Sequence, residues 1–161
     1  MAVETEVLNE LHRLRARVPQ LTGALAASTD GLVLAQDMPD VQPEGLAALT
    51  AAALGIGRRM IDLSADGEFR ELLVRGAEGC LATYAAGPSA VLTLLAGDRV
   101  NVGRLHLEGR RSGARIGALM ATRTTDERSR VSGGEPSVRP PGGQLPGVLP
   151  FRVPPQSRHR P

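Results

Sequence analysis

The stretch STDGLVLA, residues 28–35, decides the fold. Its Asp-Gly pair, Asp30 and Gly31, lies between two apolar runs that cover residues 21–28 and 32–36. Asp-Gly between such runs is typical of a tight turn that joins two antiparallel strands, with the glycine at positive φ. A carboxylate on a turn can also belong to a catalytic site, but that interpretation needs further polar groups elsewhere in the chain.

Helical periodicity flanks this hairpin on both sides. Apolar residues from Val3 to Val18 recur at helical spacing, and acids lie early and arginines late, which predicts a helix over 3–17 that Pro19 ends. A second helix is predicted over 44–63, because apolar residues recur there at steps of three and four. These residues are Leu46, Leu49, Ala53, Ile56, Met60 and Leu63.

Three strand-like segments then follow in quick succession: FRELLVR at 69–75, CLATYAA at 80–86 and AVLTLLA at 90–96. The turns between them are so short that they can join only antiparallel neighbours. A last helix is predicted over 100–123. Its apolar face includes Gly109 and Gly113, and we expect these glycines to permit close packing against the sheet.

The predicted order is therefore α-β-β-α-β-β-β-α, an α/β (α+β) fold with a single five-stranded antiparallel sheet. The later strands carry apolar residues at consecutive positions, which requires cover on both faces of the sheet. We expect the middle helix on one face and the two terminal helices on the other. This domain spans residues 1–123, and the Pro-, Gly- and Arg-rich residues 124–161 are predicted to form a disordered tail.

Composition excludes several functional classes. All 19 basic residues are arginine, charges nearly balance within residues 1–123, and aromatic residues are scarce, so nucleic-acid binding is not expected. Cys80 is the sole cysteine, which rules out an internal disulfide. The N-terminus lacks the pattern of a signal peptide, and the longest apolar stretch, 45–57, is too short to span a membrane. We expect a cytoplasmic protein that does not bind membranes.

The sequence contains no recognisable catalytic, metal or cofactor site. His12, His106 and His159 are scattered, and the absence of lysine excludes a conventional P-loop. Cys80 opens a buried strand, where a cysteine usually serves as a small hydrophobic residue. The chain is therefore not expected to be an enzyme, and the turn interpretation of Asp30 is preferred. Exposed arginines on the second and last predicted helices fit either a solvated face or a docking surface.

The order of elements, together with ASTDGLVLA at 27–35, FRELLV at 69–74 and AVLTLLA at 90–96, resembles the roadblock/dynein light chain family, and actinobacterial members in particular. The resemblance covers about residues 5–121 and implies a profilin-like fold. It also implies a homodimer in which the third strand pairs with its counterpart. The interface residues would be Phe69, Arg70, Glu71, Leu72 and Val74.

Further expectations follow from the same resemblance. Bacterial members act beside small Ras-like GTPases, in some cases with a sensor histidine kinase, and are not themselves nucleotide-hydrolysing enzymes. Partners often engage the second-helix face, which carries Arg58, Arg59 and Asp62 here.

Two functional hypotheses remain. The first is a non-enzymatic homodimeric adaptor that scaffolds or modulates a small Ras-like GTPase in bacterial signalling. The alternative is a small-molecule sensor domain of profilin-like type. Within the dimer hypothesis, either Arg70 or Arg75 would lie near Glu71 of the partner, depending on the register of the paired strands.

Overall fold

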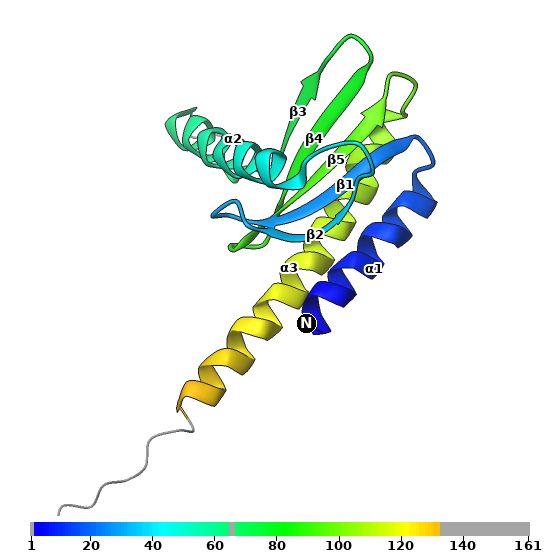
Figure 1. The fold of residues 1–161 in the computed structure, drawn as a ribbon. Coiled ribbons are helices and arrows are strands. Elements are labelled where there is room, and N and C mark those ends of the chain that lie inside the picture. Colours follow the sequence, from blue (N-terminus) through cyan, green and yellow to red (C-terminus); the bar gives the residue numbers. More distant parts are fainter. Residues whose placement is uncertain (1, 65–66, 133–161) are drawn as a thin grey trace, which may run out of the picture.

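The computed structural model describes residues 2–64 and 67–132 (Figure 1). The described residues form three helices and a five-stranded antiparallel sheet. In chain order, the elements are α1 (Ala2–Arg17), β1 (Leu21–Ser28), β2 (Val33–Asp37), α2 (Pro43–Ser64), β3 (Glu71–Arg75), β4 (Gly79–Ala86), β5 (Ala90–Gly97) and α3 (Val102–Ser132). This order confirms the predicted α+β class and the predicted succession of elements.

The strands lie in the order β2-β1-β5-β4-β3, so β2 and β3 are the two edges of the sheet. Helices α1 and α3 lie side by side on one face, and α2 crosses the other, as Figure 1 shows. On the α1–α3 face, fully buried Leu11 and Leu105 belong to one apolar cluster with Leu92 of β5. On the opposite face, Leu54 of α2 packs with Leu25 and belongs to a second cluster. The sheet therefore has an apolar core on each side.

Glycines bring α3 close to β4, as the sequence predicted. A Cβ atom added to Gly109 would lie 2.5 Å from the ring of Tyr84, far inside contact distance. At Gly113 an added Cβ would lie 3.1 Å from the Ala85 carbonyl oxygen. The helix can approach the strand this closely only because these positions carry no side chain.

The last helix is longer than expected from the sequence. The predicted end at residue 123 is wrong, because α3 continues to Ser132. The loss of apolar periodicity after Met120 suggested an end, but residues 121–132 contain neither glycine nor proline and can therefore continue the helix. Figure 1 shows this terminal part of α3 extending past the start of α1. The rest of the predicted tail, from residue 133, lies outside the described residues.

The turn at Asp30 has the predicted geometry. Gly31 has a φ of 85°, and its N–H donates to the Ser28 carbonyl oxygen at 3.0 Å. The Ser28 N–H donates to the Leu32 carbonyl oxygen at 2.8 Å, and the Ser28 hydroxyl accepts from the Leu32 N–H at 3.1 Å. Asp30 is exposed at the tip of this turn. Asp30 therefore lies in a turn between two strands, which agrees with the turn interpretation of the sequence.

Replacing Gly31 with valine should destabilise the domain. A β-branched residue at this φ costs about 1–2 kcal/mol, and the new Cβ would lie 3.1 Å from the Ala48 Cα atom of α2. Thermal unfolding should show a lower Tm for Gly31→Val. The control is Gly45→Ala, because an added Cβ there meets nothing within 4 Å. An unchanged Tm for Gly31→Val would contradict the turn assignment.

Candidate interaction surfaces

The two edges of the sheet differ in their availability for pairing. At β2, the pairing with β1 contains an irregularity between Ala26 and Ala27, and Arg15 of α1 forms an ion pair with Asp37 at 2.7 Å. Irregular, covered edges of this kind resist pairing with another chain. Strand β3 pairs with β4 without any shift in register, and no described strand lies beyond it. It is therefore the open edge of the sheet.

Helix α2 presents an apolar surface to solvent. Four large side chains recur at steps of seven, four and three along its length, and each is between 62% and 74% exposed. We name this set the α2 stripe: Leu49, Ile56, Met60 and Leu63. The buried side of the same helix carries Ala47, Thr50, Leu54 and Gly57. A contiguous exposed apolar stripe on a helix marks a contact surface rather than a solvated face.

The sheet surface next to α2 is also incompletely covered. Figure 1 shows that the tip of the β3–β4 hairpin extends beyond α2. Helix α2 crosses the sheet nearer the end that lies away from this tip. Val74 of β3 is 51% exposed, and the neighbouring Leu72 is only partly buried. Because Leu73 packs into the α1–α3 cluster, strand alternation directs Leu72 and Val74 toward the α2 side. Apolar groups of the open edge and of the α2 stripe are thus left exposed on one side of the domain.

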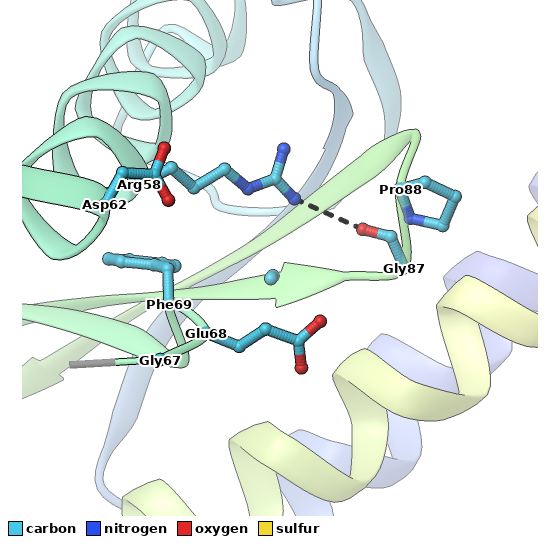
Figure 2. Close-up of a pocket in the computed structure, with 8 residues that line it drawn as sticks. Arg58, Asp62, Gly67, Glu68, Phe69, Gly87 and Pro88 are labelled. Carbon is cyan, nitrogen blue, oxygen red and sulfur yellow. Dashed lines mark hydrogen bonds between the residues drawn. The ribbon is translucent and has the colours of Figure 1, made fainter. Parts of the chain in front are cut away.

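A groove lies between the C-terminal half of α2 and the start of β3 (Figure 2). It has a volume of about 620 Å³, and Phe69 forms its apolar wall beside α2. The groove contains the side chains of Arg58, Asp62 and Glu68. The Arg58 guanidinium donates a long hydrogen bond of 3.4 Å to the Gly87 carbonyl oxygen. With two carboxylates and one guanidinium, the groove is suited to a partner segment that carries a basic side chain.

A polar cluster fixes the Glu71 side chain where β3 begins. The Arg110 guanidinium of α3 donates two hydrogen bonds to the Glu71 carboxylate, one of them at 2.9 Å. The buried Tyr84 hydroxyl lies 3.0 Å from Nδ1 of His106, whose ring nitrogen lies 3.9 Å from the same carboxylate. The hydrogen bonds from Arg110 lower the pKa of Glu71, and burial raises the pKa of Tyr84. Glu71 is therefore an ordered anion on the α3 side of the open edge.

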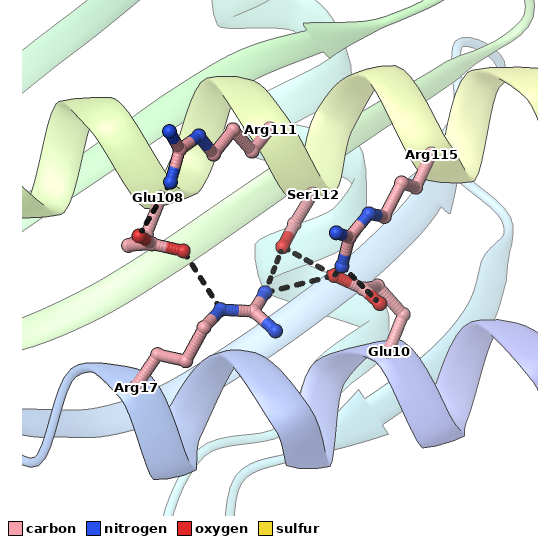
Figure 3. Close-up of polar contacts among 6 residues, drawn as sticks. All are labelled: Glu10, Arg17, Glu108, Arg111, Ser112 and Arg115. Atoms are coloured by element: carbon pink, nitrogen blue, oxygen red, sulfur yellow. Dashed lines mark hydrogen bonds and ion pairs between the residues drawn. The ribbon is translucent and has the colours of Figure 1, made fainter.

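Charged side chains join α1 to α3 on the face of the sheet opposite α2 (Figure 3). The Glu10 carboxylate is almost fully buried and accepts hydrogen bonds from the Ser112 hydroxyl at 2.6 Å and from Arg17 at 2.9 Å. Arg115 lies 3.3 Å from the same carboxylate, and Arg17 also donates to Glu108 at 2.7 Å. We call this set of residues the α1–α3 clamp. It satisfies the buried charges of both helices within one chain.

The clamp depends on an ionised Glu10. Burial alone would raise the pKa of Glu10, but the hydrogen bonds from Ser112 and Arg17, with the positive charges of Arg115 and Arg17, outweigh burial and lower it. The carboxylate consequently remains charged throughout the neutral pH range. This charge state keeps each donor of the clamp paired with an acceptor.

The described residues offer no sign of a metal centre or a membrane span. Within residues 2–64 and 67–132, histidine, cysteine and acidic side chains nowhere gather in a group of three or more that could hold a metal ion. None of the helices in the same ranges combines the length and apolar content needed to cross a bilayer.

The profile of the Roadblock/LC7 domain matches residues 7–96, which is more than half of the chain. The chain belongs to the Roadblock/LC7 family. The match runs from α1 through β5 and includes the hairpin, α2 and the open edge strand. The α2 stripe, the groove and the open edge therefore lie within the matched region. The α3 residues of the clamp and of the polar cluster lie beyond it.

Solved structures of related domains share the fold. MglB in a tetrameric arrangement is 22% identical with a TM-score of 0.68, and the alignment covers 74% of this chain and 90% of that one. The gliding protein MglB of Thermus thermophilus is 22% identical with a TM-score of 0.67, covering 74% and 91% of the two chains. A Roadblock/LC7 domain of Streptomyces avermitilis is 26% identical with a TM-score of 0.66, covering 71% and 97%. None of the curated proteins compared with the chain gives a significant match.

The interface residues expected from the sequence occupy two different settings in this Roadblock/LC7 domain. Glu71, Leu72 and Val74 lie on β3, but the strand begins at Glu71 rather than at residue 69. Phe69 precedes the strand and packs beside Gly57 of α2, so its ring already has a partner in its own chain.

The three α2 residues that were expected to contact a partner do not all lie in the same place. Arg58 and Asp62 line the groove, whereas Arg59 is exposed outside it. Glu68 joins Arg58 and Asp62 there, although it was not among the residues expected from the sequence. Glu68 follows the Asp66-Gly67 turn signal in the sequence, and no pattern there indicated that its side chain would line a groove.

The α2 stripe was present in the sequence but was assigned no function. Its residues supplied the periodicity that predicted the helix, and this prediction of a helix is confirmed. The periodic large residues, however, face solvent, and the smaller Ala47, Thr50 and Gly57 lie with Leu54 on the buried side. The sequence did contain a signal for this exposed surface, because apolar residues lie on two faces of the predicted helix and the sheet can cover only one of them.

Replacing Glu10 should loosen α1 from α3. Glu10→Ala leaves Ser112, Arg17 and Arg115 without their shared acceptor, and it should lower the free energy of unfolding by about 2 kcal/mol in urea titrations. Glu6→Ala, at an exposed position of the same helix, is the control and should change little.

The pH dependence of the same titrations tests the charge of Glu10. Because its folded pKa lies below the unfolded value of about 4.3, its contribution is present above that pH and is lost as the pH falls through the folded pKa. The stability difference between wild type and Glu10→Ala should therefore shrink in acid. A difference that stays constant down to acid would contradict an ionised clamp.

Proposed function

We propose that this chain is a non-enzymatic, homodimeric adaptor that scaffolds or modulates a small Ras-like GTPase in bacterial signalling. The observation that carries the proposal is the exposed apolar surface formed by the α2 stripe and the open edge at β3. Roadblock/LC7 proteins are generally regulatory rather than catalytic, which agrees with this proposal.

The open edge at β3 and the α2 stripe both lack a partner among the described residues, and this favours self-association. The exposed backbone groups of β3 need hydrogen-bond partners, and the α2 stripe needs apolar cover. A second copy supplies both at once when two β3 strands pair across a two-fold axis, because each copy then brings its own α2 to the same face of the joined sheet. One of the related structures is MglB in a tetrameric arrangement, so self-assembly has a precedent among proteins of this fold.

The groove on the other flank of α2 is our candidate contact for the GTPase. Arg58 and Asp62 lie one helical turn apart and line the groove with Glu68. Arg58 lies two positions from both Ile56 and Met60 of the α2 stripe, which places it about 200° around the helix from them. Self-association through the stripe would thus leave the groove accessible. The link to a small Ras-like GTPase comes from the family resemblance, and a sensor histidine kinase system remains a second candidate component of the same pathway.

The sensor alternative has less support. A ligand-binding domain of this architecture needs space between the sheet and its helices, with polar groups inside an apolar lining. Here the positions between α2 and the sheet are filled by tightly packed Leu25, Leu54 and Val91, each at most 1% exposed. The open groove lies at the surface and has charged walls, a composition that favours a protein partner.

The dimer can be tested on α2. A chain carrying Ile56→Asp and Met60→Asp should be monomeric by light scattering at concentrations where the wild type is dimeric. Full burial of such side chains contributes about 1.5–3 kcal/mol each, so the dissociation constant should rise on the order of a hundredfold or more. Gly55→Asp adds a charge to the same helix at an open position and serves as the control. A strictly monomeric wild type at tens of micromolar would remove the dimer from the proposal.

The GTPase contact can be tested at the groove. Small Ras-like GTPases encoded beside this chain should co-purify with it, and the complex should alter nucleotide hydrolysis or exchange. Arg58→Ala or Asp62→Ala should weaken binding about tenfold by calorimetry, whereas Arg59→Ala, outside the groove, should not. The absence of a complex with every such GTPase would overturn the partner assignment and favour the sensor alternative.

A further inference from the structure

The geometry points to one register for the paired edge strands. We propose that β3 pairs with β3 of a second copy so that Leu73 lies opposite the partner's Leu73, and Glu71 forms an ion pair with the partner's Arg75. This inference rests on the homodimer of the proposed function and specifies its contact. The register follows from the direction of the backbone groups, from symmetry and from the faces on which the side chains lie.

The backbone of β3 shows which groups are free. The Arg70 carbonyl oxygen accepts from the Ala85 N–H at 3.5 Å, and the Gly76 N–H donates to the Gly79 carbonyl oxygen at 2.9 Å. In an antiparallel ladder, the N–H and C=O of one residue point to the same neighbour, and those of the next residue point the opposite way. Arg70 and Gly76 both bond toward β4, and Leu72 and Val74 lie at even steps between them, so their backbone groups also bond toward β4. The backbone groups of Glu71, Leu73 and Arg75 point outward.

Symmetry restricts how these groups can be paired. A two-fold axis that relates two antiparallel edge strands is perpendicular to the sheet, so residues opposite each other lie on the same face. The axis must then pass between a residue and its own copy. With the axis at Leu73, Glu71 lies opposite the partner's Arg75, and every outward N–H and C=O of β3 has a partner.

The neighbouring registers leave groups unpaired. An axis at Leu72 would place Arg75 opposite the partner's Phe69, which precedes the strand and packs beside Gly57. An axis at Val74 would place Glu71 opposite the partner's Ala77, which lies in the turn between β3 and β4. Both registers shorten the ladder of hydrogen bonds between the two strands, and backbone groups left unpaired in the interface cost free energy.

The side chains favour the same register. Glu71 contacts Arg110 of α3 and Leu73 packs into the α1–α3 cluster, so alternation places Arg75 on the same face as Glu71. Arg75 is exposed and forms no ion pair with any described residue. Its copy in the partner supplies Glu71 with a second cation. Arg70 lies on the opposite face by the same alternation, so it is Arg75 and not Arg70 that meets the partner's Glu71.

Cysteine cross-linking distinguishes the three registers in the full chain. Leu72→Cys and Val74→Cys are prepared as separate variants, one with a size tag, then mixed, allowed to exchange subunits and oxidised. With the axis at Leu73, position 72 lies opposite position 74 of the partner with Cα atoms about 4.5 Å apart, a distance that a disulfide spans. Identical positions are then offset along the strand beyond the limit of about 7 Å. Wild type is the control for the buried Cys80.

We expect a disulfide-linked heterodimer in the mixture and little linkage in either variant alone. Efficient linkage of Leu72→Cys alone would place the axis at Leu72, and efficient linkage of Val74→Cys alone would place it at Val74. Each of these results would overturn the register while leaving the dimer intact. A wild type that dimerises without any cross-link would move the interface away from β3, and a monomeric wild type would contradict the homodimer itself.

Charge reversal tests the ion pair independently. Arg75→Glu would set two carboxylates opposite each other twice in the dimer, and its dissociation constant should rise about tenfold at low salt. Arg70→Glu makes the same charge change on the opposite face and should have a much smaller effect. Equal effects of the two substitutions would contradict the pairing of Glu71 with the partner's Arg75.

Discussion

The sheet of this protein is apolar on both faces, and each face must be covered. Two helices, α1 and α3, cover one face, with the glycines of α3 bringing that helix against β4. A single helix crosses the other face and leaves apolar groups of β3 and of its own outer surface exposed. The need to remove this remaining apolar surface from water connects the fold to the proposed self-association.

The two sides of the domain meet this requirement by different means. On the α1–α3 side, buried carboxylates have arginine and serine partners within the chain, so the helix pair is complete in one copy. On the α2 side, the buried residues are small and the large residues face outward. In the proposed dimer, this arrangement directs the apolar contacts to the α2 side of the molecule. The groove of Arg58 and Asp62 lies on the other flank of α2, where it would remain open to a different partner.

Local patterns in the sequence predicted most of the fold. The Asp-Gly turn, the helical periodicity and the short connections each depend on residues close in the chain, and the structure confirms them. The end of α3 was missed because the segment 124–132 is polar, and polar residues without glycine or proline extend an exposed helix as readily as they form a loop. The α1–α3 clamp was not predictable, since Glu10 and Ser112 are 102 positions apart. The separation of Arg58 and Asp62 from Arg59 likewise depends on where α2 crosses the sheet.

The most direct test of this account is amide hydrogen exchange at Leu73, measured by NMR as a function of protein concentration. Its N–H points outward from the open edge, so in a single copy it is exposed to solvent and should exchange quickly. In the paired dimer it donates to the partner's Leu73 and should become protected as the concentration rises, until protection saturates. An amide that exchanges quickly at every concentration, in a chain that remains folded and dimeric, would contradict the pairing of β3 with its copy.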